Sequence, residues 1–362
     1  MSNQTIEEAI VTAEDIRHGA VDVTIGQSNL RARVKNDGRV GLYSTLRKSS
    51  SFVEVKNLGG QNATSAARNL NLDDIQLSKV AKRQVANAIG IPVPYWKRCE
   101  ESNPEMLVDH INHWLPQSAS RRMIRMVTDD SAQSQHCRAF LSDRFMPVEN
   151  EWVLNQLGQT LPSEDSTPWR IYVDENGMNF SSRSDVMTKA LDDSHSKKIG
   201  DVMQGGIRVL NSEVGGGKIV AQLCLYRLVC LNGMTMPIGL GGYSRRHVGN
   251  SSTEVLSDLR GSIENILGGD QFNVAMERIA GAINQQMAKD WISRLVKDND
   301  LTDDEEESLK FNYNTDQNLL NLWGAVNAVT ALAHQTKSID RKTELEAIGG
   351  RLLTSPRALI AA

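Results

Sequence analysis

Residues 201–232 read DVMQGGIRVLNSEVGGGKIVAQLCLYRLVCLN and place two long apolar-rich runs on either side of three glycines. Apolar runs bounded by turn residues are typical of β-strands. We therefore predict strands over Asp201–Val214 and Lys218–Asn232, with Gly215-Gly216-Gly217 as the tip of the hairpin that joins them. This hairpin predicts a β-rich centre for the chain.

The segments before this hairpin extend the same pattern. Trp169–Val173 and Met178–Ser182 flank a Glu-Asn-Gly turn signal, which predicts a second hairpin. Arg122–Val127 and Cys137–Phe145 are expected to be strands, separated by a polar segment. Pro147–Leu161 is expected to be a helix, because proline favours the first turn of a helix.

The two ends of the chain differ from the centre. Val21–Ile25 and Leu30–Val34 are predicted strands, and a turn signal leads from the second into Arg39–Tyr43. Leu72–Glu101 is helical in pattern, with a stop at Gly90. Apolar residues recur at helical spacing from Ser252 onwards.

This order of elements predicts an α+β fold, because strands and helices are segregated along the chain instead of alternating. The expected fold has N-terminal strands with a helical block, a central antiparallel β-rich sheet and a helical C-terminal third. The expected parts are a flexible leader (1–20), a small strand element with a helical hairpin block (21–117), a β-rich core (118–250), a helical region (251–352) and a frayed tail (353–362).

Composition narrows the class of protein. Hydrophobic residues make up 40% of the 362 and charged residues 23%, which is typical of a globular protein. Apolar runs stay shorter than the roughly 18 residues of a membrane span, and the N-terminus is polar and acidic, so a cytoplasmic protein without a membrane partner is expected. The cysteines form no C-x-x-C pair and are expected to be free thiols: Cys99, Cys137, Cys224 and Cys230.

Charge is distributed unevenly along the chain. Residues 1–98 hold 14 Lys and Arg against 9 Asp and Glu, whereas residues 251–362 hold 11 against 17. A basic front with an acidic back fits a nucleic-acid face joined to a solvated end. Ordinary fluctuation of composition is the alternative.

Several arginines occur near the ends of predicted strands. Each planar guanidinium group could donate two parallel hydrogen bonds to phosphate oxygens. Period-two alternation places Arg121 and Arg125 on one face of their strand and Arg122 on the other. The alternative is a set of surface arginines paired with Asp129, Asp130 or Asp143. The candidate DNA-binding residues are Arg31, Arg33, Lys35, Arg121, Arg122, Arg125, Arg138, Arg144, Arg245 and Arg246.

Motifs for catalysis or cofactor binding are weak in this sequence. Lys218 after the three glycines lies between strands, so a hairpin tip is favoured over a phosphate-binding loop. His110 and His113 could be metal ligands together with Asp109, but no third ligand follows at a recognisable spacing, so a packed, hydrogen-bonded helix end is favoured. Cys137 has no base beside it in a recognisable pattern. We therefore expect no catalytic residues, no metal and no cofactor.

Four linked segments carry a family resemblance. They are residues 86–99 (ANAIGIPVPYWKRC) with 109–115 (DHINHWL), 138–150 (RAFLSDRFMPVEN), 208–217 (RVLNSEVGGG) with 226–234 (YRLVCLNGM), and 322–334 (LWGAVNAVTALAH). In this order they resemble the phage- and plasmid-encoded family known as domain of unknown function 932. The resemblance implies a mobile-element protein in the cytoplasm of a bacterial host, with a role in DNA metabolism.

The β-rich centre followed by helices is also similar, at the level of fold, to the β-β-β-α core of single-strand annealing proteins. That similarity implies rings or filaments that hold single-stranded DNA in a basic groove, with a phage exonuclease or host recombination proteins as partners. The expected function is therefore non-catalytic, oligomeric single-stranded DNA binding in recombination. The alternatives are a helix-turn-helix regulator using Val80–Arg98, a metal-dependent nuclease and a counter-defence interaction protein.

Overall fold

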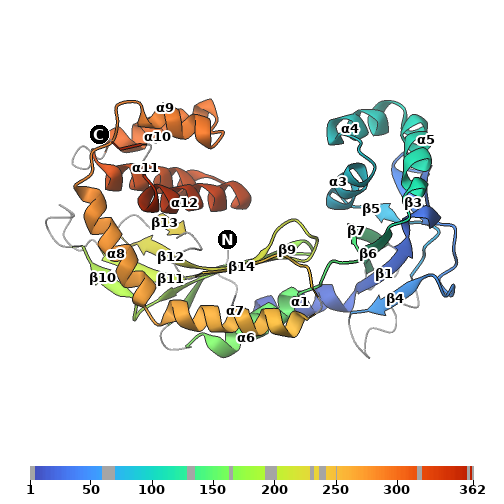
Figure 1. Ribbon diagram of the computed structural model, residues 1–362, viewed down its shortest axis with the longest axis horizontal. Coiled ribbons are helices and arrows are strands. Elements are labelled where there is room, and N and C mark those ends of the chain that lie inside the picture. Colours follow the sequence, from blue (N-terminus) through green and yellow to red (C-terminus); the bar gives the residue numbers. More distant parts are fainter. Residues whose placement is uncertain are drawn as a thin grey trace.

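The computed structural model shows an α+β protein with two lobes (Figure 1), which confirms the expected fold class. An N-terminal lobe is built on one sheet, and a larger lobe is built on a second sheet and most of the helices. The structure describes residues 5–58, 70–128, 135–162, 166–191, 202–228, 232–235, 242–249, 251–315, 320–356 and 359–360.

The sheet of the N-terminal lobe has the strand order β4-β1-β6-β7-β5. Strand β6 lies at its centre, antiparallel to β1 on one side and to β7 on the other, while β5 runs parallel to β7. A separate hairpin of β2 and β3 confirms the strands expected around the first turn signal. The strands are β1 Ala20–Gly26, β2 Leu30–Val34, β3 Val40–Ser44, β4 Glu54–Asn57, β5 Gln76–Leu77, β6 Arg121–Thr128 and β7 Gln135–Ser142.

Three short helices pack against this sheet and hairpin, and their ends follow from local chemistry. Ser78 caps the first helix, because its side-chain oxygen accepts a hydrogen bond from the Ala81 amide at 3.1 Å. Gly90, in the left-handed region at φ 74°, follows its last turn. The helices are α3 Lys79–Ala88, α4 Val93–Ser102 and α5 Pro104–Trp114.

The second lobe has a seven-stranded sheet in the order β13-β12-β11-β9-β8, with β10 beside β11 and β14 beside β12. The antiparallel pairs β11–β12 and β8–β9 confirm the two hairpins expected at the centre of the chain. The strands are β8 Ser166–Val173, β9 Gly177–Ser184, β10 Thr188–Ala190, β11 Val202–Ser212, β12 Ile219–Arg227, β13 Asn232–Thr235 and β14 Tyr243–Arg245.

Helices cover both faces of this sheet (Figure 1). Ile207 and Val209 of β11 join the apolar core, whereas Arg208 between them donates hydrogen bonds to Thr235 and to Glu346 of α12. The helices of this lobe are α1 Ile6–His18, α6 Asn150–Thr160, α7 Ser252–Leu267, α8 Asp270–Ile283, α9 Trp291–Asp298, α10 Asp303–Thr315, α11 Leu322–Gln335 and α12 Ile339–Thr354. No helix among the described residues is both long and apolar enough to cross a membrane.

Both ends of the chain are more ordered than the sequence indicated. The prediction of a flexible leader over residues 1–20 is wrong for residues 6–18. These residues form helix α1, which packs against α6 and β8 and has Ala9 and Ala13 buried. The expected frayed tail is also wrong in part, because Leu353 and Leu359 are buried and Ile360 bridges to Met287. Apolar contacts with distant segments order both ends, and local periodicity does not report such contacts.

The expected β-rich core over 118–250 does not form one sheet. Strands β6 and β7 belong to the N-terminal sheet, because β6 pairs along its length with β1, about a hundred residues earlier. The larger sheet begins only at β8. Strand pairing across such a separation is decided by tertiary packing.

Candidate functional site

The start of β6 and the end of β7 bring three candidate arginines together. Arg122 pairs in register with Ser142, and the chain turns directly after Ser142. The Phe145 amide donates to the Ser142 carbonyl oxygen at 3.0 Å, and the Arg144 amide donates to the Ser142 side-chain oxygen at 3.2 Å. The turn therefore carries Arg144 back beside the first residues of β6.

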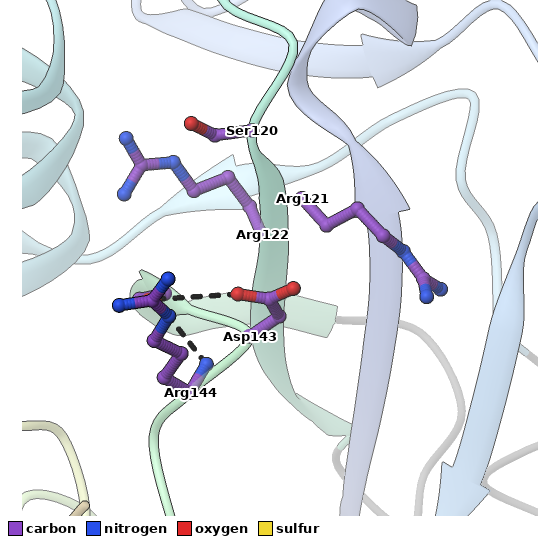
Figure 2. Close-up of a pocket in the computed structure, with 6 residues that line it drawn as sticks. Ser120, Arg121, Arg122, Asp143 and Arg144 are labelled. Atoms are coloured by element: carbon purple, nitrogen blue, oxygen red, sulfur yellow. Dashed lines mark hydrogen bonds between the residues drawn. The ribbon is translucent and has the colours of Figure 1, made fainter.

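These residues line a cavity of about 330 Å³ at the surface of the N-terminal lobe. Figure 2 shows Arg122 and Arg144 extending to one side of β6 and Arg121 to the other. Three guanidinium groups accompany a single carboxylate, so the lining has an excess of positive charge. The lining residues are Ser120, Arg121, Arg122, Ser142, Asp143 and Arg144, and we call this cavity the arginine pocket.

The three arginines differ in how firmly they are held. Arg122 donates from Nε to Gln27 Oε1 at 2.7 Å, and its guanidinium carbon lies 5.4 Å from the centre of the Phe140 ring. Partial burial lowers the pKa of Arg122, against the opposing effect of Asp143. Arg121 is exposed and lies 3.5 Å from Glu54, and Arg144 is exposed and forms no ion pair with any described residue.

A second cavity, of about 460 Å³, adjoins the arginine pocket and shares Arg122 and Ser142 with it. Its other lining residues come from α3 and β7. They are Gln84, Asn87, Ala88, Phe140 and Leu141, and we call this cavity the α3 pocket.

Arg125 and Arg138 are not surface residues, and their assignment to an exposed DNA-binding groove is wrong. Both side chains are fully buried between the lobes. A bulge in the β6–β7 ladder puts Arg138 and Ala139 on the same side of β7. Arg125 and Arg138 both face the second lobe. Carboxylates there take the place of the water molecules that would hydrate an exposed arginine.

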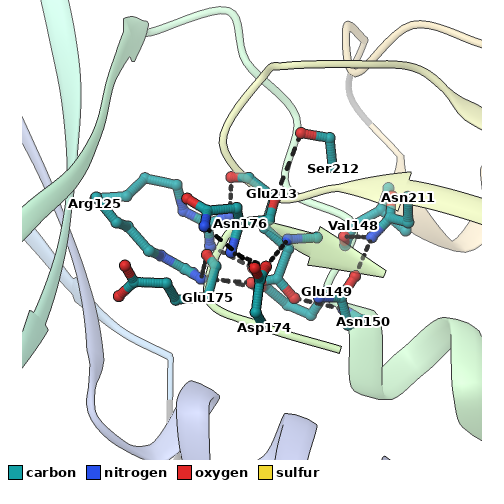
Figure 3. A network of polar contacts seen from close by, with 12 residues as sticks. Arg125, Val148, Glu149, Asn150, Asp174, Glu175, Asn176, Asn211, Ser212 and Glu213 are labelled. Carbon is teal, nitrogen blue, oxygen red and sulfur yellow. Dashed lines mark hydrogen bonds and ion pairs between the residues drawn. The ribbon is translucent and has the colours of Figure 1, made fainter. Parts of the chain in front are cut away.

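Arg125 contacts acidic groups from both lobes, and Figure 3 shows it near Glu149 and Glu213 of the second lobe. Its Nε donates to Asp22 at 2.8 Å, and its Nη2 donates to Glu149 at 2.5 Å. A third bond runs from its Nη1 to the carbonyl oxygen of Glu213 at 2.8 Å. Arg138 adds a bond to the Glu213 carboxylate at 2.6 Å. We call these five side chains the interlobe ion cluster.

The interlobe ion cluster holds three carboxyls against two guanidinium groups, so its full ionisation would leave a buried negative charge. Burial raises the pKa of Asp22 and of Glu213. Burial would also raise that of Glu149, but the guanidinium groups of Arg125 and Arg138 outweigh it and lower the pKa. Protonation of one of these carboxyls would remove the excess charge.

The remaining basic candidates lie apart from the arginine pocket. On the β2–β3 hairpin, Arg33 and Lys35 lie 3.9 and 3.1 Å from Asp74, while Arg31 donates to the carbonyl oxygen of Ser28 at 2.8 Å. In the second lobe, Arg245 lies 3.3 Å from Asp258. Arg246 is exposed beside it, without an ion pair among the described residues.

The nuclease and nucleophile candidates have ordinary structural contacts. His110 stacks on Tyr95 and shares a 3.2 Å hydrogen bond with its hydroxyl, and His113 packs edge-on against Trp114. Among the described residues, no three metal-ligating side chains come together. Cys99, Cys137 and Cys224 are buried free thiols, as expected, and burial raises the pKa of Cys137.

Some expectations fall on parts of the chain that the structure does not describe. Cys230 and the proposed pairing partners Asp129 and Asp130 lie outside the described residues. The helices expected for a helix-turn-helix are present as α3 and α4. On α4, Lys97 lies 4.0 Å from Glu101 one helical turn away.

Residues 139–348 match the family described as a domain of unknown function, DUF932. The chain belongs to this family. The matched region covers more than half of the chain and confirms the family resemblance. Of the four sequence segments, the one at 86–99 and 109–115 lies before this region and is not part of the match. Comparisons with curated proteins and with solved structures give no match.

The DUF932 region includes only part of the arginine pocket. It begins on β7 at Ala139, so it contains Asp143 and Arg144 as well as Glu213 of the interlobe ion cluster. Arg121 and Arg122 lie before it. The arginine pocket is therefore shared between the family region and the N-terminal segment that pairs with it.

Sequence reasoning found Arg121, Arg122 and Arg144 but missed the residues around them. Ser120 belongs to no motif, and the 138–150 segment that contains Ser142 indicates no binding role for this serine. The place of both serines in the pocket depends on the register of β6 against β7. Asn87 and Phe140 adjoin Arg122 because α3 packs on β7. The sequence signal for these candidates was a basic residue next to a predicted strand end. This signal does not distinguish exposed arginines from buried ones.

Proposed function

We propose that this protein binds single-stranded DNA through its phosphates at the arginine pocket, as a non-catalytic factor in recombination or annealing that acts as an oligomer. The observation that carries the proposal is that Arg121, Arg122 and Arg144 all line one open cavity, with Arg122 and Arg144 extending to the same side of β6. One guanidinium group can donate two parallel hydrogen bonds to phosphate oxygens, and Ser120 and Ser142 add hydroxyl donors to the same cavity. Arg144 supports it further, because its charge is not neutralised by a described neighbour.

The proposed ligand follows from the balance of charge and from the family resemblance. The Asp143 carboxylate repels anions, so the pocket is poorly suited to a free anion that it would enclose on all sides. It is better suited to a phosphate of the DNA backbone that is contacted by the arginines alone. Contacts to the backbone give affinity with little dependence on base sequence. The expected resemblance in fold to single-strand annealing proteins is the reason for proposing the single strand over the duplex.

Fluorescence anisotropy with a labelled oligonucleotide, measured as salt is raised from about 50 to about 200 mM, tests the proposal. We expect wild-type binding to weaken steeply with salt. Arg121→Ala combined with Arg144→Ala should make the log-log slope shallower by about 1.4, since each lost phosphate contact on a single strand changes it by about 0.7. Both side chains are exposed, so the fold should survive.

The control is Arg260→Ala, which removes an exposed arginine from α7, where it pairs with Glu264. It changes the net charge of the protein in the same direction and should leave the slope within error. Absence of binding at about 50 mM salt would contradict the proposal. Mass photometry with and without the oligonucleotide tests the oligomer, and a monomer under both conditions would contradict that part.

A further inference from the structure

The arginine pocket and the α3 pocket are two compartments of one surface site, since both are lined by Arg122 and Ser142. Their linings differ in character. The arginine pocket presents charged groups and hydroxyls, whereas the α3 pocket combines Phe140 and Leu141 with two side-chain amides. A charged compartment next to a partly apolar one matches the phosphate and the base of a nucleotide.

Arg122 is held in a fixed orientation between the two compartments. Its guanidinium group lies over the Phe140 ring, which is only 2% exposed, and its Nε is anchored to Gln27 at 2.7 Å. A guanidinium plane that is already supported on one face loses little freedom when a second flat group stacks on it.

The amides of the α3 pocket have different roles. Gln84 is engaged at both ends, because its Nε2 donates to the Val214 carbonyl oxygen and its Oε1 accepts from the Phe140 amide, each at 2.7 Å. Asn87 lies three residues further along the same side of α3 and is exposed. Among the described residues, its side chain has no hydrogen-bond partner, so its donor and acceptor remain available to a ligand.

We propose that the α3 pocket seats one unpaired nucleobase, stacked on the Arg122 guanidinium, while the phosphate of that nucleotide lies in the arginine pocket. This inference rests on the proposed function and deepens it. Asn87 lies where its amide can donate to and accept from the edge of the base. Every base has a flat face, so the α3 pocket can accept any of the four bases. It requires single-stranded DNA because each base within a duplex is already stacked on both faces.

The test compares a 12-nucleotide thymidine strand with a strand of 12 abasic deoxyribose phosphates, which carry the same charge. Stacking of a base on a flat side chain is worth about tenfold or more in affinity, so wild type should bind the abasic strand about tenfold more weakly. Arg122→Lys keeps the charge but loses the plane. It should bring the ratio of the two affinities to within about twofold while leaving the salt slope unchanged.

Asn87→Ala supplies a second, independent variant. Its side chain is exposed on α3 and forms no hydrogen bond with another described residue, so folding should be unaffected. Loss of one hydrogen bond should reduce the ratio about threefold. Arg260→Lys, a conservative change on α7, is the matched control and should keep the full ratio.

The outcomes separate the two proposals. Equal wild-type binding of both strands would overturn the base seat and leave phosphate binding intact, whereas no binding of either strand would remove both. A wild-type preference that survives in both Arg122→Lys and Asn87→Ala would show that the base is bound elsewhere and would overturn the assignment. If Arg122→Lys failed to fold, as judged by circular dichroism, the result for Asn87→Ala would decide.

Discussion

Neighbouring arginines of β6 have opposite roles because their environments differ. Arg122 lies at the edge of two surface cavities. Arg125, three residues further along the strand, is fully buried among Asp22, Glu149 and Glu213. A buried guanidinium is stable only while its hydrogen-bond partners neutralise it. The surface arginine is free to meet a ligand, and the buried one is committed to the fold.

Arg125→Ala should therefore destabilise the protein strongly. The change leaves Asp22 and Glu149 buried without their main partner, and breaking such a pair costs about 3–5 kcal/mol. Urea unfolding followed by circular dichroism measures this loss. Arg144→Ala, at an exposed and unpaired position, is the control and should change the free energy of unfolding by less than about 0.5 kcal/mol. Equal stability of the two variants would contradict the buried role of Arg125.

At the scale of elements, helix α1 ties the N-terminus to the second lobe. It packs against α6 and β8, and Arg17 on its last turn lies 2.5 Å from Glu151 of α6. A capping box between Thr5 and Glu8 satisfies the first backbone amides of the helix. The helix is thus defined locally, but its place in the molecule depends on α6.

A charge placed on either face of α1 should show which face is packed. Ala9 is fully buried, so Ala9→Glu should cost about 3 kcal/mol or more through steric overlap and burial of an unpaired carboxylate. Val11→Glu introduces the same charge at a side chain that is 55% exposed and should cost less than about 0.5 kcal/mol. Thermal unfolding of the two variants makes the comparison. Similar midpoints would show that α1 is not part of the packed core.

At the scale of the whole molecule, the interlobe ion cluster joins two otherwise separate apolar cores. One core fills the N-terminal lobe and the other fills the second lobe, and a small apolar cluster of Ala139, Leu141 and Val214 is separate from both among the described residues. Arg125 and Arg138 supply the positive charges, and carboxyls from both lobes surround them. The position of the arginine pocket relative to the second lobe therefore depends on this buried cluster.

Stability should depend on pH through this cluster, with opposite signs for two carboxyls. The raised pKa of Asp22 means that the folded protein keeps a proton there that the unfolded chain loses above pH 3.8. Its contribution to stability is present at low pH and is lost as pH rises through the raised pKa. The lowered pKa of Glu149 has the reverse effect, so its contribution is present above pH 4.5 and is lost as pH falls.

Urea unfolding of wild type, Asp22→Asn and Glu149→Gln between about pH 3 and about pH 7 tests both signs. The advantage of wild type over Asp22→Asn should shrink as pH rises, and its advantage over Glu149→Gln should shrink as pH falls. The two isosteric variants act as controls for each other. Parallel pH profiles for all three proteins would contradict the opposite pKa shifts of Asp22 and Glu149.

The sequence by itself determined the local features of this protein. Turn residues at 36–38 and 215–217 and the cap at Ser78 specify hairpins and a helix start through contacts within a few residues. Segregation of strands and helices determined the α+β class, and linked segments determined the DUF932 family. Such features depend on backbone geometry and neighbouring side chains, which are written in the order of residues.

Only the tertiary structure decided which arginines reach the surface. Pairing of β6 with β1 and packing of β7 on the second lobe bury Arg125 and Arg138, while the turn after Ser142 brings Arg144 beside Arg122. Burial depends on groups that lie tens to hundreds of residues away, and a bulge reverses the side on which a strand residue points. The physical reason is that desolvation and charge pairing act through space, so a local pattern of arginines cannot distinguish a ligand site from an ion cluster.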